Sequence, residues 1–121
     1  MLTVNEKKRT VGKSVRGRAQ ASGADRLSDE QLLGMFRDSG DERLFARLVK
    51  RYERELFGYL RRFLGNAAMA EDAFQATFLQ IFVKCGQFDV KRRFRPWLYT
   101  VATNQAIDLQ RRNRRQIIDL L

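Results

Sequence analysis

The stretch LFARLVKRYERELFGYLRRFL, residues 44–64, decides the fold class of this chain. Its apolar side chains recur every three or four residues, the spacing that places them on one face of an α-helix. Asp41 can cap the start of this helix, and Gly65 and Asn66 follow it as a stop signal. The stretch therefore predicts a long amphipathic helix. Its apolar positions are Phe45, Leu48, Val49, Tyr52, Leu56, Tyr59, Leu60 and Phe63.

Three further helices are expected around this one. Ser28, with Gln31 three residues later, forms a capping box for a short helix that stops near Gly40. A third helix is expected over residues 68–85, and a fourth begins at Pro96, which suits the first position of a helix, and reaches about residue 115. We predict an all-α domain, a small three- to four-helix bundle. The aromatic residues expected to close its core are Phe45, Tyr52, Tyr59, Phe74, Phe78 and Phe82.

The net charge of +10 is concentrated in two segments. Residues 1–26 carry seven basic and two acidic side chains, residues 27–90 are nearly neutral, and residues 91–115 carry eight basic and one acidic. The first segment has no apolar periodicity, so we expect a flexible basic tail. The chain is therefore divided into this tail, a helical domain over residues 27–115, and residues 116–121 as the start of a linker.

The composition excludes several classes of function. The chain has no His, and its single Cys85 can support neither a disulfide framework nor a cysteine cluster for a metal ion. It also lacks a Gly-rich phosphate loop, so we expect no catalytic residues, no enzyme activity, no metal and no cofactor. No apolar run approaches ~18 residues, so we expect a cytoplasmic protein without membrane insertion.

The fourth expected helix carries two neighbouring stripes of side chains. The packing stripe consists of Leu98, Ala102, Gln105 and Leu109. The second stripe consists of Trp97, Val101, Asn104, Asp108, Arg111 and Arg112. The loop QFDVKRRFR, residues 87–95, precedes both stripes and supplies Lys91, Arg92, Arg93, Phe94 and Arg95.

This mixture of cations and aromatic rings favours nucleic acid with unstacked bases, because guanidinium groups hold phosphates while rings stack on a displaced base. A structural alternative is that Asp108 only pairs with Arg111 or Arg112 one turn away, while Trp97 covers the core. Both interpretations fit the residues alone.

The residues from Leu27 to Arg115 also resemble region 2 of bacterial sigma factors of the extracytoplasmic-function (ECF) type, in the sigma-70 family. Four segments carry the resemblance, in the right order and at the right spacing. They are LFARLVKRYERELFGYLRRFL, AEDAFQATF, FRPWLYTVATN and NQAIDLQRRNRR.

The resemblance implies two binding surfaces. In such factors the segment matching AEDAFQATF docks onto the clamp helices of the largest catalytic subunit of RNA polymerase, which assigns Asp72, Gln75 and Phe78 to polymerase binding. The loop matching residues 87–95 captures a flipped base of the non-template strand in the promoter −10 element. An anti-sigma factor is a further candidate partner.

The resemblance also implies roles along the fourth helix. Asn104 is expected to read a base, because an amide offers both a donor and an acceptor to a base edge. Arg111 and Arg112 are expected to hold phosphates. Trp97 either wedges at the melting point or packs beneath the loop while keeping some contact with DNA.

Two functions therefore stay open: a promoter-recognition domain, or a helical module that binds polymerase or a regulator without reading DNA sequence. Relatives of this type continue into a second helical domain for the −35 element, so we expect these 121 residues to be part of a longer protein.

Overall fold

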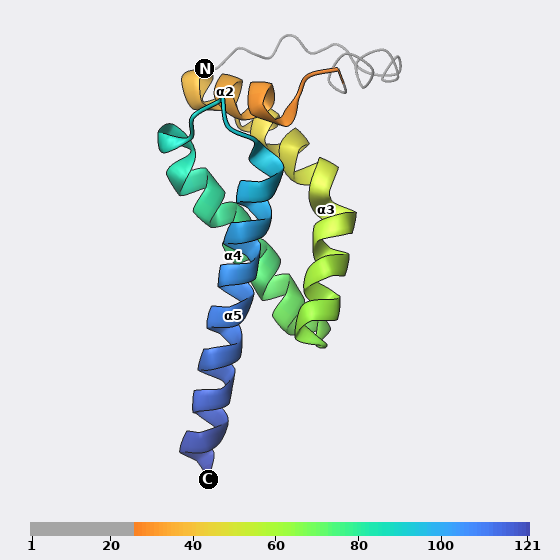
Figure 1. Cartoon of the computed structure of the whole chain (residues 1–121), viewed down its shortest axis with the longest axis vertical. Coiled ribbons are helices and arrows are strands. Elements are labelled where there is room, and N and C mark those ends of the chain that lie inside the picture. The colour runs from red at the N-terminus through yellow and green to blue at the C-terminus, as the bar shows by residue number, and fades with distance from the viewer. Residues whose placement is uncertain (1–25) are drawn as a thin grey trace.

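The computed structural model describes residues 26–121, and all regular secondary structure in this part of the chain is helical (Figure 1). Its order is α2 (Asp29–Ser39), α3 (Glu42–Leu64), α4 (Ala67–Lys84), the short 3₁₀ helix η2 (Cys85–Gln87) and α5 (Phe94–Leu120). The prediction of a small all-α domain is confirmed. The expected basic tail lies outside the described residues, except for Arg26.

Local sequence signals set the ends of α2 and α3. The Ser28 hydroxyl accepts a hydrogen bond from the Gln31 backbone amide at 3.0 Å, and the Gln31 side chain accepts one from the Ser28 amide at 2.7 Å. Asp41 caps α3, and Gly65 ends it in the left-handed conformation with φ of 70°. A glycine suits this position because other residues pay a steric cost for positive φ.

The core lies where α3 and α4 pack together with α2 and the first half of α5. Fully buried Leu48, Leu56 and Leu60 come from α3, as its periodicity predicts. Phe45 packs against Phe78 and Phe82 with ring centroids 6.2 and 5.5 Å apart, although Phe82 keeps 42% of its surface exposed.

The last helix differs from its prediction at both ends. It begins at Phe94, so Pro96 is its third residue and not its first. A proline is tolerated there because the amides of the first turn have no partner within the helix. The helix continues to Leu120 through the residues assigned to a linker, and its last turns extend beyond the other helices (Figure 1). Residues 111–121 are all exposed.

Within residues 26–121, no helix combines the length and the apolar character needed to cross a membrane.

Candidate nucleic-acid interface

The loop between η2 and α5 is fixed at both ends by side chains from α2. Arg37 donates a hydrogen bond to the Phe88 carbonyl at 3.2 Å. At the other end, the Glu30 carboxylate accepts a hydrogen bond from the Phe94 amide at 2.7 Å. Between them, the Asp89 carboxylate accepts a hydrogen bond from the backbone amide of Lys91. Helix α2 therefore determines where the basic loop lies.

Three aromatic rings form the floor beneath this loop. Phe88 stacks on Trp97 with centroids 5.0 Å apart and planes 20° apart. Phe94 meets both rings edge-on, at 6.3 and 6.1 Å. Trp97 is half-buried, so it packs beneath the loop and still keeps an exposed surface.

Phe94 is fully buried, which corrects the prediction that it contacts DNA. A ring with no exposed surface cannot stack on a base, so Phe94 supports Trp97 from within the core. The sequence pattern missed this because Phe94 stands among exposed cations.

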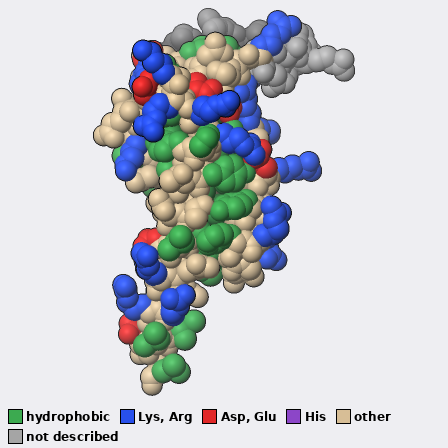
Figure 2. Space-filling view, viewed as in Figure 1, with side chains coloured by type: hydrophobic (Ala, Val, Ile, Leu, Met, Phe, Trp, Pro, Cys, Tyr) green, Lys and Arg blue, Asp and Glu red, His purple; other side chains and the backbone are tan. Residues whose placement is uncertain are grey.

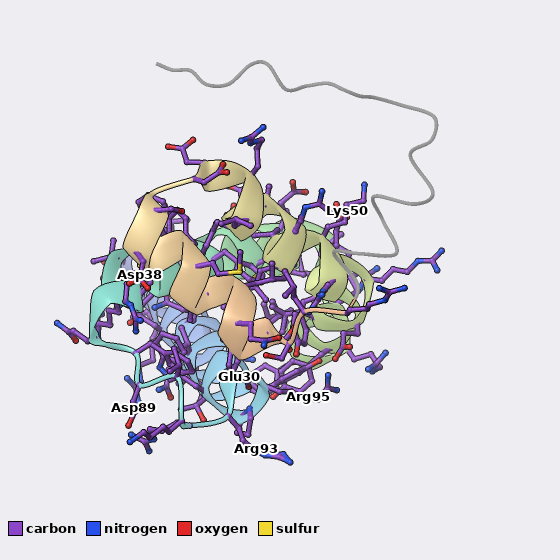
Figure 3. All side chains as sticks on the ribbon, turned by 90° about the horizontal axis from the view of Figure 1, so that it is seen from above. Glu30, Asp38, Lys50, Asp89, Arg93 and Arg95 are labelled. Atoms are coloured by element: carbon purple, nitrogen blue, oxygen red, sulfur yellow. The ribbon has the colours of Figure 1, made fainter. Side chains whose placement is uncertain are left out.

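A groove opens between the loop and the first turns of α5. Its volume is about 630 Å³. It is lined by Lys84, Gln87, Phe88, Asp89, Arg92, Arg93, Pro96, Trp97 and Thr100. Arg92 and Arg93 are exposed, and Figure 3 shows Arg93 pointing outward from the loop, with Asp89 farther along the same edge of the molecule. We call this the Trp97 groove: an aromatic wall bordered by cations.

The exposed face of α5 continues the Trp97 groove along the helix. At ~100° per residue, Trp97, Asn104 and Arg111 fall within one narrow stripe. Asn104 and Arg111 are exposed. Arg112 instead donates to Asp108 at 3.2 Å, the i,i+4 ion pair of the structural alternative. In this structure Asp108 neutralises a neighbouring cation.

Arg95 turns away from the Trp97 groove, although it adjoins Arg93 in sequence. Its guanidinium forms a 2.7 Å ion pair with Glu55 on α3 and lies over the rings of Tyr52 and Tyr99, 5.8 and 5.3 Å from their centroids. The hydrogen bonds donated by Arg95 and Tyr99 hold the pKa of Glu55 below its ordinary value. Burial, with help from Glu55, raises the pKa of Tyr99 to about 12. Arg95 therefore fastens the start of α5 to α3.

The residues predicted to bind polymerase lie on α4 and divide into two groups. Asp72 and Gln75 are exposed. Phe78 is only 5% exposed and packs against Phe45 and Phe74 in the core, which corrects its assignment as a surface contact. The apolar residue exposed beside Gln75 is Leu79, at 64%.

Sequence reasoning missed Glu30 and Arg37, the two residues that hold the loop. Both lie on a helix more than 50 residues before their partners, so no local spacing connects them to the loop. Helix α2 also approaches the loop closely at Gly34, where an added Cβ would lie only 3.1 Å from a Val90 methyl group.

The helical arrangement and the basic, aromatic loop before its longest helix are those of a sigma-factor domain. Residues 48–116 match the family described as sigma-70 region 2, and the chain belongs to that family. The resemblance recognised in the sequence is therefore confirmed.

Its relatives include ECF sigma factors. The chain is 39% identical to the ECF RNA polymerase sigma factor SigW of Bacillus subtilis over 75 residues, 62% of this chain and 40% of SigW. It is 42% identical to the RNA polymerase sigma factor CarQ of Myxococcus xanthus over 79 residues, 65% of this chain and 45% of CarQ. The chain thus spans less than half the length of these relatives.

One solved structure is similar in fold, with a TM-score of 0.70 and 27% sequence identity. It is an NMR structure of an engineered region 2 of sigmaE in complex with GTAAAA. The similarity covers 76% of this chain and 95% of that one.

Proposed function

We propose that this chain is the part of an alternative sigma factor that binds core RNA polymerase and recognises the promoter −10 element. The observation that carries this proposal is the Trp97 groove, which joins a half-buried indole to the exposed cations Arg92 and Arg93 on a domain similar in fold to an engineered region 2 in complex with GTAAAA. Such a domain acts in the cytoplasm, where transcription begins.

The Trp97 groove can hold an unpaired base without any proton transfer. A base of the non-template strand stacks against Trp97, Arg92 and Arg93 hold the neighbouring phosphates, and Asn104 offers its amide to a base edge. Unstacking a base costs a few kcal/mol, and one stacked base returns ~1–3 kcal/mol. The balance is narrow, so polymerase has to position the domain and supply further contacts.

The outer face of α4 is the proposed polymerase surface. Asp72 and Gln75 supply polar contacts to the clamp helices of the largest catalytic subunit, and Leu79 supplies the apolar contact first assigned to Phe78. Large apolar residues exposed beside polar ones are typical of protein interfaces. An anti-sigma factor that covered this face would compete with polymerase.

Selection of single-stranded sequences bound by the complex of this chain with core polymerase tests the proposal. We expect a −10-type sequence to be enriched, and Asn104→Ala and Arg93→Ala to lose that enrichment while core binding is retained. Arg47→Ala, on the exposed surface of α3 outside the Trp97 groove, is the matched control. If the two variants select the same sequences as the wild type, the chain is a protein-interaction module whose basic face is only solvated.

A further inference from the structure

A second groove lies between α3 and α5, on the other side of Pro96 from the Trp97 groove. Its volume is about 610 Å³. Its lining residues include Arg54, Gly58, Tyr59, Arg62, Pro96 and Tyr99. We call it the Tyr99 groove. Pro96 lines both grooves, so the two surfaces meet at the first turn of α5.

The Tyr99 groove carries uncompensated positive charge. Its only carboxylate, Glu55, already accepts hydrogen bonds from Arg95 and from the Tyr99 hydroxyl, both at 2.7 Å. Arg54 and Arg62 are exposed, and neither forms an ion pair with any carboxylate among residues 26–121. Two guanidinium groups about two helical turns apart on α3 are therefore available to an anion.

The wall of the Tyr99 groove is aromatic. Tyr59 and Tyr99 meet edge-on with centroids 5.1 Å apart, and the Tyr59 hydroxyl is held by Thr103 on α5 at 2.7 Å. Figure 2, seen from the same side as Figure 1, shows a band of hydrophobic side chains beside α5, bordered by Lys and Arg side chains toward α3. Gly58 adds no side chain, so a ligand can approach the helix backbone between the two arginines.

We propose that the Tyr99 groove binds the next nucleotides of the same single DNA strand after it leaves the Trp97 groove. Cations beside aromatic rings suit phosphates and unstacked bases together, whereas an acidic peptide would leave the rings unused. The shared Pro96 makes the two surfaces continuous. This inference rests on the proposed function.

The test compares two strands of the same starting sequence, about four and about eight nucleotides long, in fluorescence anisotropy titrations with the 121-residue chain. The wild type should bind the longer strand about tenfold more tightly. The R54Q/R62Q double variant should lose this gain and lower the salt slope for the longer strand by about 1.4, since each phosphate contact contributes about 0.7. Binding of the shorter strand should stay unchanged.

Gly58→Leu tests the groove without removing charge. An added Cβ would meet only Arg62 Nη1 at 3.6 Å, an ordinary contact, and leucine is a better helix former than glycine. The variant should lose the tighter binding of the longer strand while keeping the circular-dichroism spectrum of the folded chain. Arg47→Gln removes one charge from α3 outside the groove and should keep the gain.

Three results would overturn the inference: no length gain in the wild type, equal weakening of both strands by R54Q/R62Q, or equally effective competition by a glutamate peptide of matched charge. If the shorter strand still binds and depends on Asn104, the proposed function survives these results. If neither strand binds, this inference fails, and the selection with core polymerase decides the proposed function.

Discussion

The carboxylate of Glu30 on α2 accepts a hydrogen bond from the backbone amide of Phe94, 64 residues further along the chain. Arg93, the residue before α5, makes no side-chain capping bond of its own. Glu30 therefore caps the helix from another part of the fold, and its charge lies at the positive end of the α5 dipole. The first turn of α5, which carries Trp97, is positioned by this contact.

Removal of the Glu30 carboxylate should destabilise the domain and loosen the loop together. We expect Glu30→Ala to lower the free energy of unfolding by about 1–2 kcal/mol, the usual range for a helix cap, measured by urea denaturation. Glu30→Gln keeps an acceptor and should recover most of the loss. Equal stability of Glu30→Ala and the wild type would show that the capping bond contributes nothing in solution.

Phe94 should behave as a core residue. We expect Phe94→Ala to lower the free energy of unfolding by about 3–5 kcal/mol, because it empties a fully buried site. Urea denaturation measures this loss. If Phe94→Ala kept wild-type stability and lost only DNA binding, Phe94 would be a DNA contact, as its sequence neighbours first indicated.

The sequence predicted the helices wherever local signals set their ends. The capping box at Ser28, the cap at Asp41 and the glycine at 65 act within four residues, so they can be read directly. The start of α5 could not be read in this way. Its capping partner is Glu30, and the proline rule alone placed the helix start two residues late.

The sequence predicted which segments form the candidate site, but not which of their side chains face it. The basic loop and the helix after it do form a groove, but adjacent cations point to different partners. Arg95 forms an ion pair with Glu55 on α3, and Phe94 packs in the core against Tyr52 on α3 while its amide bonds to Glu30 on α2. These partners are distant in sequence, so the loop sequence alone does not show them. Counting charge by segment also failed to single out Arg54 and Arg62, because residues 27–90 are nearly neutral in total. In the fold these two arginines line a groove beside α5.

Trp97 should report ligand binding directly. It is the only tryptophan in the chain, and it lines the Trp97 groove. We expect single-stranded DNA to quench its fluorescence in a saturable titration, because a base stacked on the indole provides a quenching partner. Asn104→Ala should shift this titration to higher DNA concentration. Saturable DNA binding with unchanged emission would place the DNA away from the Trp97 groove.

The bond between Glu55 and Arg95 should stabilise the domain at neutral pH and lose its effect in acid. The pKa of Glu55 is lower in the folded chain than in the unfolded one, so the contribution is complete above the unfolded pKa and disappears as the pH falls through the folded pKa. Both side chains are partly exposed, so we expect about 0.5–1 kcal/mol.

Glu55→Gln measures this contribution. Urea denaturation of the variant and the wild type between neutral pH and about pH 3 should give stability curves that converge in acid. A difference that stayed constant over this range would mean that the ionised carboxylate is not what stabilises the start of α5.

Asp108 should restrain DNA binding. Its ion pair with Arg112 joins two side chains that are more than half exposed, so it contributes only ~0.3–0.5 kcal/mol to stability. Asp108→Asn should leave the free energy of unfolding nearly unchanged, yet strengthen single-stranded DNA binding about two- to fivefold at low salt, because Arg112 is released and a negative charge near the phosphates is removed. Glu42→Gln, which removes the same charge from α3 outside both grooves, should leave DNA affinity unchanged. Weaker binding by Asp108→Asn would instead show that the carboxylate contacts the DNA itself, for example by accepting a hydrogen bond from a cytosine amino group.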